Sequence, residues 1–325
     1  MLRGTGRSSR GGGAHSGRST RWAILLFMGY WIMFAAELSM IRFIKGVDGR
    51  WVATTADQPA VWMSLTILAV TVLSIVVSVL YIISWVKERR LRRWLWGYHE
   101  LDGYDVIHIV AWMHVYQAAT LILYGLVLEG SFFASGTVGS VFESAMYQMF
   151  LLLLIPLWFR GRWEEIGIKK PIKLWRMILT LLLLLLFIAQ VMDLVVTKPV
   201  ADWFGISLAS EREQQIENEI VQAKNTNMLA AWASVLVIGI LVPIAEELLF
   251  RGVVQTYLVR RLGALAGILL SSFWFALLHM DVALLAPLFV IGVGLGFVRH
   301  RYQSIWGAVV LHAINNMTGV LYYFQ

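Results

Sequence analysis

The chain has 325 residues and a formal net charge of +7, with 59% hydrophobic and 14% charged residues. This composition is typical of a polytopic membrane protein and argues against a soluble domain. The absence of cysteine excludes disulfides, iron–sulfur clusters and thiol catalysis. The positive charge does not indicate nucleic-acid binding, because the basic residues gather at the ends of apolar segments, where they set membrane orientation.

Residues 1–21 are rich in Gly, Ser and Arg and contain almost no apolar side chains. We expect them to form a disordered cytoplasmic tail. Apolar runs of about 18–25 residues follow along nearly the whole chain, and they predict an all-α, polytopic bundle of about eight or nine transmembrane helices. The predicted spans are 22–44, 61–86, 106–129, 141–159, 173–196, 228–250, 262–279, 283–299 and 305–323.

Two segments between these spans are more polar than the rest. Residues 160–170 mix charges with apolar side chains, which favours a position along the membrane surface. In residues 200–227, Ser210 precedes a run of good helix formers and predicts a capped extracytoplasmic helix. The expected parts of the chain are the tail at 1–21, the N-terminal helices with the interfacial segment at 22–172, and a C-terminal bundle at 173–325 that contains the polar insert.

Clusters of Lys and Arg precede the first predicted span and follow the second, fourth, sixth and eighth. All of these clusters fall on one side if the spans alternate, which places the N-terminus in the cytoplasm. Arg42, Lys45 and Arg50, in the first outer loop, are the exception. We expect an integral protein of a bacterial cytoplasmic membrane, with the lipid bilayer as a partner and no nucleic-acid partner.

Two adjacent glutamates, Glu246 and Glu247, lie within one of the most apolar stretches of the chain. Ionisable groups at membrane depth cost roughly 2.5–3.5 kcal/mol each on insertion scales, and they tend to mark functional sites. Helical spacing places Glu247 and Arg251 on one face, where they can form an ion pair. Glu246 lies about 100° further round the helix, without an obvious partner in its own segment, which indicates a functional role.

Three further polar residues lie in the apolar C-terminal third of the chain: His279, His312 and Asn316. The spacing of His312 and Asn316 places both on one helical face. Measured along the helices from the basic ends, Glu246, His279 and Asn316 lie at depths of about 21, 26 and 16 Å. Because this spread is small beside a hydrocarbon core of about 30 Å, side chains from three helices can meet.

These residues resemble the motifs of the CAAX protease and bacteriocin-processing (CPBP, or Abi) intramembrane proteases, which are related to the type II CAAX prenyl endopeptidases. The three motifs appear in the family order: Glu-Glu-x-x-x-Arg at Glu246, Glu247 and Arg251; Phe-x-x-x-His at Phe275 and His279; His-x-x-x-Asn at His312 and Asn316. The resemblance covers about residues 173–325. It implies an intramembrane protease domain that acts on a peptide or protein substrate at the membrane.

The chemistry of the residues agrees with what the resemblance implies. Peptide-bond hydrolysis needs an activated water and a group that stabilises the tetrahedral oxyanion. We expect Glu246 to act as the general base and His279 to hold and polarise the same water. The neighbouring ion pair is formally neutral, so it can orient the site without adding charge. His312 and Asn316 offer N–H donors suited to an oxyanion hole.

Other functions would use the same residues. Glu246, His279 and His312 form the His₂Glu ligand set of a catalytic zinc site. We expect no cofactor, since Arg251 is an unfavourable neighbour for a dication and the sequence has no His-Glu-x-x-His motif. An ion-coupled transporter would also use buried charges, but the repeated Gly/Pro-broken helices typical of transporters are missing. A catalytically inactive membrane scaffold is the third alternative.

The remaining polar residues in apolar segments are assigned structural roles: His108, His114, Glu37 and Asp193. Three glycines alternate with apolar residues in the eighth predicted span, at Gly292, Gly294 and Gly296. They predict close helix packing. They do not indicate a nucleotide-binding loop, because no strand precedes them.

Overall fold

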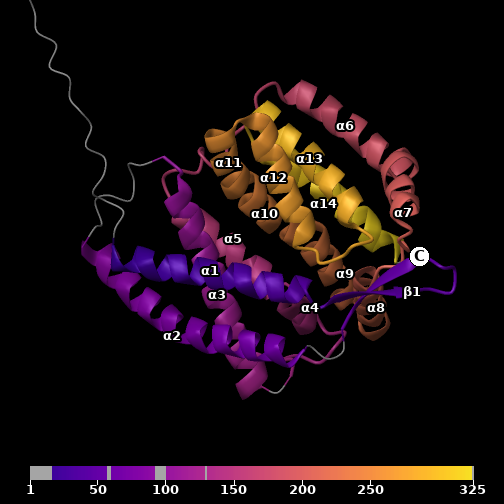
Figure 1. Cartoon of the computed structure of the whole chain (residues 1–325). Helices are drawn as coiled ribbons and strands as arrows, with labels where there is room; N and C mark the ends of the chain where they lie inside the picture. The colour runs from indigo at the N-terminus through magenta and orange to yellow at the C-terminus, as the bar shows by residue number, and fades with distance from the viewer. Residues whose placement is uncertain (1–16, 57–59, 92–99, 129, 324–325) are drawn as a thin grey trace, which may run out of the picture.

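The apolar segments fold as helices, which satisfy each backbone N–H and C=O within the segment where water is excluded. The computed structural model describes residues 17–56, 60–91, 100–128 and 130–323. Figure 1 shows the N-terminal helices packed on one side and the C-terminal helices on the other. The N-terminal helices are α1 (Arg18–Leu38), α2 (Val61–Leu91), α3 (Gly103–Ile122), α4 (Val138–Ser144) and α5 (Met146–Trp158).

The C-terminal part begins with α6 and ends with three helices that pack together. Its helices are α6 (Leu174–Gln190), α7 (Lys198–Phe204), α8 (Glu211–Thr226), α9 (Met228–Leu236), α10 (Val242–Glu247), α11 (Gln255–Leu262), α12 (Ala264–Leu277), α13 (Leu285–Tyr302) and α14 (Trp306–Tyr322). Helices α9, α10 and α11 form one continuous helix, in which π-helical turns at Val237–Leu241 and Leu248–Val254 join the three pieces.

Judged by length and composition, fewer helices can span a membrane than we expected. In the described ranges, four helices are long and apolar enough to cross a membrane, or up to six if each bent helix pair is one span. The expectation of eight or nine spans is therefore not confirmed, although each predicted run does contain a helix. Part of the reason is length, since α12 has only 14 residues.

The described residues are mostly helical, as expected, and a β-hairpin among them corrects the predicted end of the first span. The first helix ends at Leu38 rather than near residue 44, and strand β1 (Ile41–Lys45) pairs antiparallel with β2 (Trp51–Thr55). The β-branched residues of both strands favour extended backbone. Gly49, with φ of 77°, supplies the left-handed conformation that the turn between them needs. The apolar residues of β1 continue the hydrophobic run of α1, which is why composition alone predicts a longer span.

The structure also shows where α1 begins and whether the polar insert at residues 200–227 contains the predicted helix. Helix α1 begins at Arg18, so residues 18–21 are helical and do not belong to a disordered tail, while residues 1–16 lie outside the described residues. The expected helix in the insert is present as α8. The side chain of Ser210 caps it by accepting a hydrogen bond from the backbone N–H of Glu213 at 2.9 Å.

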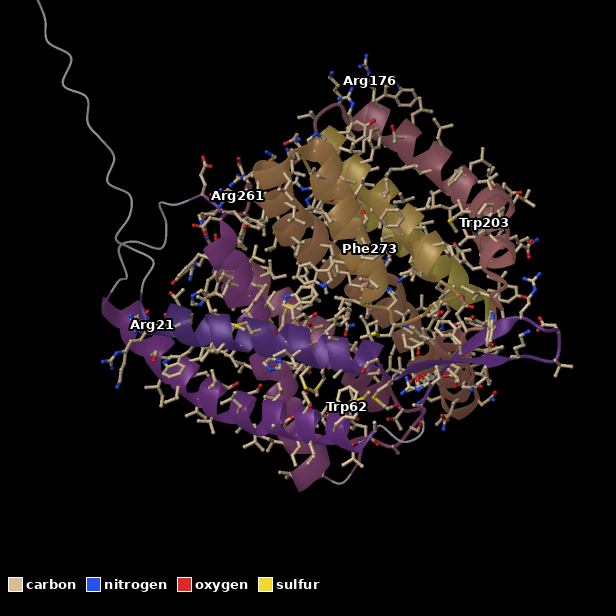
Figure 2. The ribbon with its side chains drawn as sticks, viewed as in Figure 1. Arg21, Trp62, Arg176, Trp203, Arg261 and Phe273 are labelled. Atoms are coloured by element: carbon tan, nitrogen blue, oxygen red, sulfur yellow. The ribbon has the colours of Figure 1, made fainter. Side chains whose placement is uncertain are left out.

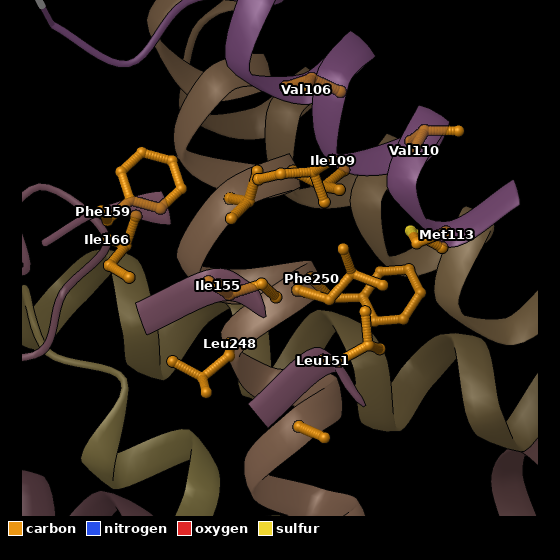
Figure 3. Close-up of a cluster of buried hydrophobic side chains, with 14 of the residues drawn as sticks. Val106, Ile109, Val110, Met113, Leu151, Ile155, Phe159, Ile166, Leu248 and Phe250 are labelled. Carbon is orange, nitrogen blue, oxygen red and sulfur yellow. The ribbon is translucent and has the colours of Figure 1, made fainter. Parts of the chain in front are cut away.

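The main core joins the N-terminal helices to the continuous helix that carries the glutamates. Figure 3 shows apolar side chains of α3 and α5 meeting those around Leu248 and Phe250. Ile166, from the 160–170 segment, is also fully buried in this cluster. A second core lies between α6, α13 and α14. The N-terminal helices are therefore packed directly behind the candidate site. The predicted domain boundary at residue 172, and the surface position of 160–170, stay predictions.

Two histidines of α3 pack against neighbouring helices, in agreement with their structural assignment. The His108 Nδ1 atom lies 2.9 Å from the Tyr81 hydroxyl, and His114 Nε2 lies 2.7 Å from the Ser74 hydroxyl. Both partners come from α2. These bonds satisfy polar groups that would otherwise be costly inside the bundle.

Glycines allow the C-terminal helices to approach closely. A Cβ atom at Gly292 would lie 3.0 Å from the Ser272 Cβ, and one at Gly296 would lie 2.9 Å from Ile268. At Gly294 the nearest atom would be 3.7 Å away, which is ordinary contact. The predicted close packing is thus confirmed for the first two glycines but not for Gly294. At Gly267 a Cβ atom would lie 2.5 Å from the Val259 backbone nitrogen, which, unlike the end of a flexible side chain, cannot easily move aside.

Replacing Gly267 by alanine should therefore force α11 and α12 apart and destabilise the protein by about 1–3 kcal/mol. The measurement is thermal unfolding of the detergent-solubilised protein. Gly294→Ala is the matched control, because its new methyl group has room and should leave the unfolding temperature unchanged or slightly raised. Equal unfolding temperatures for the two variants would contradict the packing described here.

Candidate active site

The two glutamates lie at the end of α10, between two π-helical turns. Pro243, in the first turn of α10, lacks the N–H that would continue a regular ladder, and its ring clashes with the carbonyl four residues earlier. The preceding π-helical turn, Val237–Leu241, contains that residue. Such turns often occur at functional sites. Here they set the directions in which the side chains of Glu246 and Glu247 leave the helix.

Glu247 and Arg251 form the ion pair that their spacing predicts. The Arg251 Nε atom lies 3.3 Å from Glu247 Oε2, and both side chains are fully buried. Arg251 Nη2 also donates to the Gly292 carbonyl of α13 at 3.1 Å. The guanidinium carbon lies 4.6 Å from the centre of the Phe275 ring of α12. The pair therefore connects three helical segments.

His312, on α14, contacts both glutamates. Its Nδ1 atom lies 3.0 Å from Glu247 Oε1, and its Nε2 atom lies 3.8 Å from Glu246 Oε2. Because a carboxylate only accepts, the bond to Glu247 places a proton on Nδ1 of His312. The imidazole thus lies between the fully buried carboxylate and the one whose side chain is 17% exposed. Sequence spacing alone did not predict this bridge.

His279 lies just after the end of α12 and is held by its own chain. Its Nδ1 atom lies 2.9 Å from the Phe275 carbonyl oxygen, which can only accept a hydrogen bond. In its neutral form His279 therefore carries its proton on Nδ1, and Nε2 keeps a free lone pair. The Phe275 ring packs edge-on against both His279 and His312, at centroid distances of 4.9 and 5.7 Å. This ring fixes the orientation of both imidazoles.

Asn316 is one helical turn beyond His312, and its amide is tied to the first π-helical turn. Its Nδ2 atom donates to the Ile238 carbonyl at 3.3 Å. A π-helical turn leaves backbone carbonyls without their usual partner, and the amide satisfies one of them. One N–H of the Asn316 amide is used in this bond, and the second is left for another acceptor.

A cavity of about 410 Å³ borders Glu246 and His279. One wall comes from the motif-bearing helices and the other comes from α1, α3 and α5. The wall from the N-terminal helices includes Tyr30, Phe34, Glu37, Tyr116, Tyr147 and Gln148. Sequence analysis missed this wall and assigned Glu37 a structural role. The signal available was a set of aromatic and polar side chains within otherwise aliphatic spans.

Residues of α8 and of the α12–α13 loop lie at the mouth of the cavity. Arg212 lines it, and its Nη1 atom donates to the His279 carbonyl at 3.1 Å. Partial burial, with the nearby Asp281 carboxylate, raises the pKa of the neighbouring Glu213. The cation of Arg212 therefore lines this end of the cavity, and the acidic side chains of Glu213 and Asp281 lie near each other beside it.

The zinc alternative requires Glu246, His279 and His312 to lie close enough together to share one ion. Within the ranges that the structure describes, no three His, Asp or Glu side chains are grouped so that they could hold a metal ion. The Nδ1 atoms of His279 and His312 are engaged in other hydrogen bonds, which leaves Nε2 of each ring as the nitrogen that could bind a metal. Glu246, His279 and His312 are not grouped as a ready-made zinc site in this arrangement, and zinc dependence is the subject of an experiment described below.

Removing one partner of the buried ion pair should leave an uncompensated charge. Arg251→Met is expected to destabilise the protein by about 3–5 kcal/mol, because the Glu247 carboxylate would stay buried without its cation. Adding Glu247→Gln to this variant should recover a substantial part of the loss. Thermal unfolding in detergent measures both effects. If the two losses of stability simply add, so that the double variant loses as much as the two single variants together, the pairing is contradicted.

Comparisons with known proteins agree with the motifs. Residues 228–318 match the family model described as "Type II CAAX prenyl endopeptidase Rce1-like". Comparisons with curated proteins and with solved structures gave no match. All six candidate residues, from Glu246 to Asn316, lie inside the matched segment. This segment of the chain is thus related to the CAAX protease family.

Proposed function

We propose that this protein is an intramembrane endopeptidase that hydrolyses a peptide bond within or beside the bilayer. The family match supports a protease activity on a peptide or protein at the membrane, and the apolar helices support an integral membrane protein. The observation that carries the proposal is the meeting of two carboxylates and two imidazoles from separate helices, beside a cavity with room for a peptide segment.

Glu246 is the proposed general base. Its side chain is partly accessible and lines the cavity, whereas Glu247 is buried and compensated by Arg251. Glu246 takes a proton from water as the water oxygen attacks the substrate carbonyl carbon. The same carboxylic acid later gives the proton to the leaving amine, so the carboxylate is regenerated. The free Nε2 lone pair of His279 accepts the other hydrogen of the water and orients it.

His312 and Asn316 are the proposed donors to the oxyanion. With Nδ1 of His312 bonded to Glu247, Nε2 is the nitrogen directed toward the reacting centre. When both nitrogens carry protons, the Nε2–H can donate to the tetrahedral oxygen. The second amide N–H of Asn316 can add a further bond. Each donor of this kind is typically worth about 10²–10³ in rate.

Glu246→Gln should lower the rate of peptide hydrolysis at least about 100-fold, because the amide cannot take a proton from water. The assay uses purified protein in detergent with internally quenched peptides, including a farnesylated peptide of the CAAX type, and mass spectrometry of the products. Glu217→Gln, a neutralised carboxylate on the exposed face of α8, is the control and should keep full activity.

Hydrolysis by the Glu246→Gln variant at the wild-type rate would remove this residue from the mechanism. No hydrolysis by the wild-type protein, across the peptides tested, would favour the transporter or scaffold alternatives. The two outcomes are distinct, because the first leaves the protease assignment in place and the second does not.

The proposed mechanism is also metal-free. Exhaustive chelation followed by removal of the chelator should therefore leave the rate of peptide hydrolysis unchanged. A loss of activity that added Zn²⁺ restores would contradict this point and return Glu246, His279 and His312 to the role of ligands.

A further inference from the structure

A second hollow leads from the β-hairpin to the candidate active site. It has a volume of about 210 Å³ and lies between β2, the start of α8 and the loop after α12. Arg212, His279 and Met280 line both this hollow and the larger cavity that contains Glu246. The two spaces therefore meet at His279.

One edge of β2 faces this hollow with open hydrogen-bonding positions. In an antiparallel pair, alternate residues direct their backbone N–H and C=O toward the partner strand or away from it. Trp51 directs them away, since its N–H donates to the Gly205 carbonyl at 2.7 Å and its carbonyl accepts from Ser207 at 2.8 Å. The two-residue period then places the backbone groups of Ala53 and Thr55 on the same outward edge.

The register of the hairpin supports this assignment. Ala56 donates its N–H to the Met40 carbonyl across the hairpin. The even-numbered residues of β2 therefore direct their backbone groups toward β1, and the odd-numbered residues direct theirs away from it. In the described part of the chain, backbone pairing on the outward edge of β2 stops at Trp51. Ala53 and Thr55 both line the hollow. Their N–H and C=O groups are therefore available to a further strand.

We propose that the substrate peptide binds as an added strand along the open edge of β2, and that this edge guides it to Glu246 and His279. The inference rests on the proposed protease function. Strand addition is a common mode of peptide recognition, in which main-chain hydrogen bonds supply affinity for many sequences. It also holds the peptide extended, which exposes each peptide bond in turn to the catalytic groups.

The position of the edge assigns the side from which the peptide enters. Helix α1 has 21 residues, so the hairpin that follows it lies about 30 Å from the start of the helix. Figure 2 shows Arg21, Arg176 and Arg261 along the rim of the molecule away from the hairpin. If this basic rim faces the cytoplasm, as the positive-inside rule predicts, the entrance lies on the outer face. The substrate class is then an extended segment of an exported or surface-anchored peptide.

Proline substitution tests the edge directly. Ala53→Pro removes one outward N–H while leaving the inward bonds of the neighbouring residues, and proline is tolerated on such an edge. For a peptide that the wild-type protein cleaves, KM should rise roughly three- to tenfold with kcat within about twofold, as expected for one lost hydrogen bond. The matched control is Phe43→Pro, whose residue pairs with Ala53 and faces the opposite edge of the hairpin.

A scan of the peptide gives a second measurement that does not depend on the folding of any variant. Single N-methyl groups placed at successive backbone positions of the cleaved peptide should raise KM at every second position only. A response without this alternation, together with equal KM values for the two proline variants, would overturn strand addition and leave the protease function standing. Failure of the wild-type protein to cleave any peptide would overturn the protease function itself.

Discussion

The charge of the Glu247 carboxylate is compensated by the Arg251 guanidinium inside the bundle, and the whole candidate site depends on this ion pair. Neither charge could stay buried alone at acceptable cost. Once paired, each side chain also holds a neighbour. Arg251 binds a carbonyl of α13 and faces a ring of α12, while Glu247 binds His312 of α14. One neutral pair thus fixes the helices that surround Glu246.

This arrangement explains why two adjacent glutamates have different surroundings. Glu247 has its oxygens directed at Arg251 and His312, away from water. Glu246, about 100° further round the helix, reaches the cavity beside His279, and its Oε2 atom lies 3.8 Å from Nε2 of His312. A carboxylate that is accessible and lacks a close ion-pair partner can accept a proton from water. The buried neighbour maintains the geometry, and the accessible one is available for chemistry.

Much of the site could be predicted from the sequence, because its main features are local or follow from depth. The Glu247–Arg251 pair follows from helical spacing, and the meeting of His279 and Glu246 follows from their similar distance from the basic helix ends. The bridge from His312 to both glutamates could not be predicted, since it depends on the rotation of α14 about its axis. The bond from Asn316 to Ile238 depends on a π-helical turn, and Pro243 predicts an interrupted helix there without specifying that kind of turn.

The fold was predicted less completely where contacts join segments distant in the chain. Ile41 and Phe43 fit the end of an apolar span equally well, and only pairing with residues ten or more positions away makes them a strand. The wall that α1, α3 and α5 contribute to the cavity has the same cause. Its aromatic residues resemble ordinary membrane anchors until the helices are placed together.

The central claim is that Glu246 and His279 act on one water in one step. A double-mutant cycle on kcat/KM, with Glu246→Gln, His279→Ala and the combined variant, tests it most directly. The account predicts that the second substitution adds little to the loss caused by the first. Losses that multiply, so that the double variant is slower by the product of the two single effects, would show that the residues act independently and would contradict it.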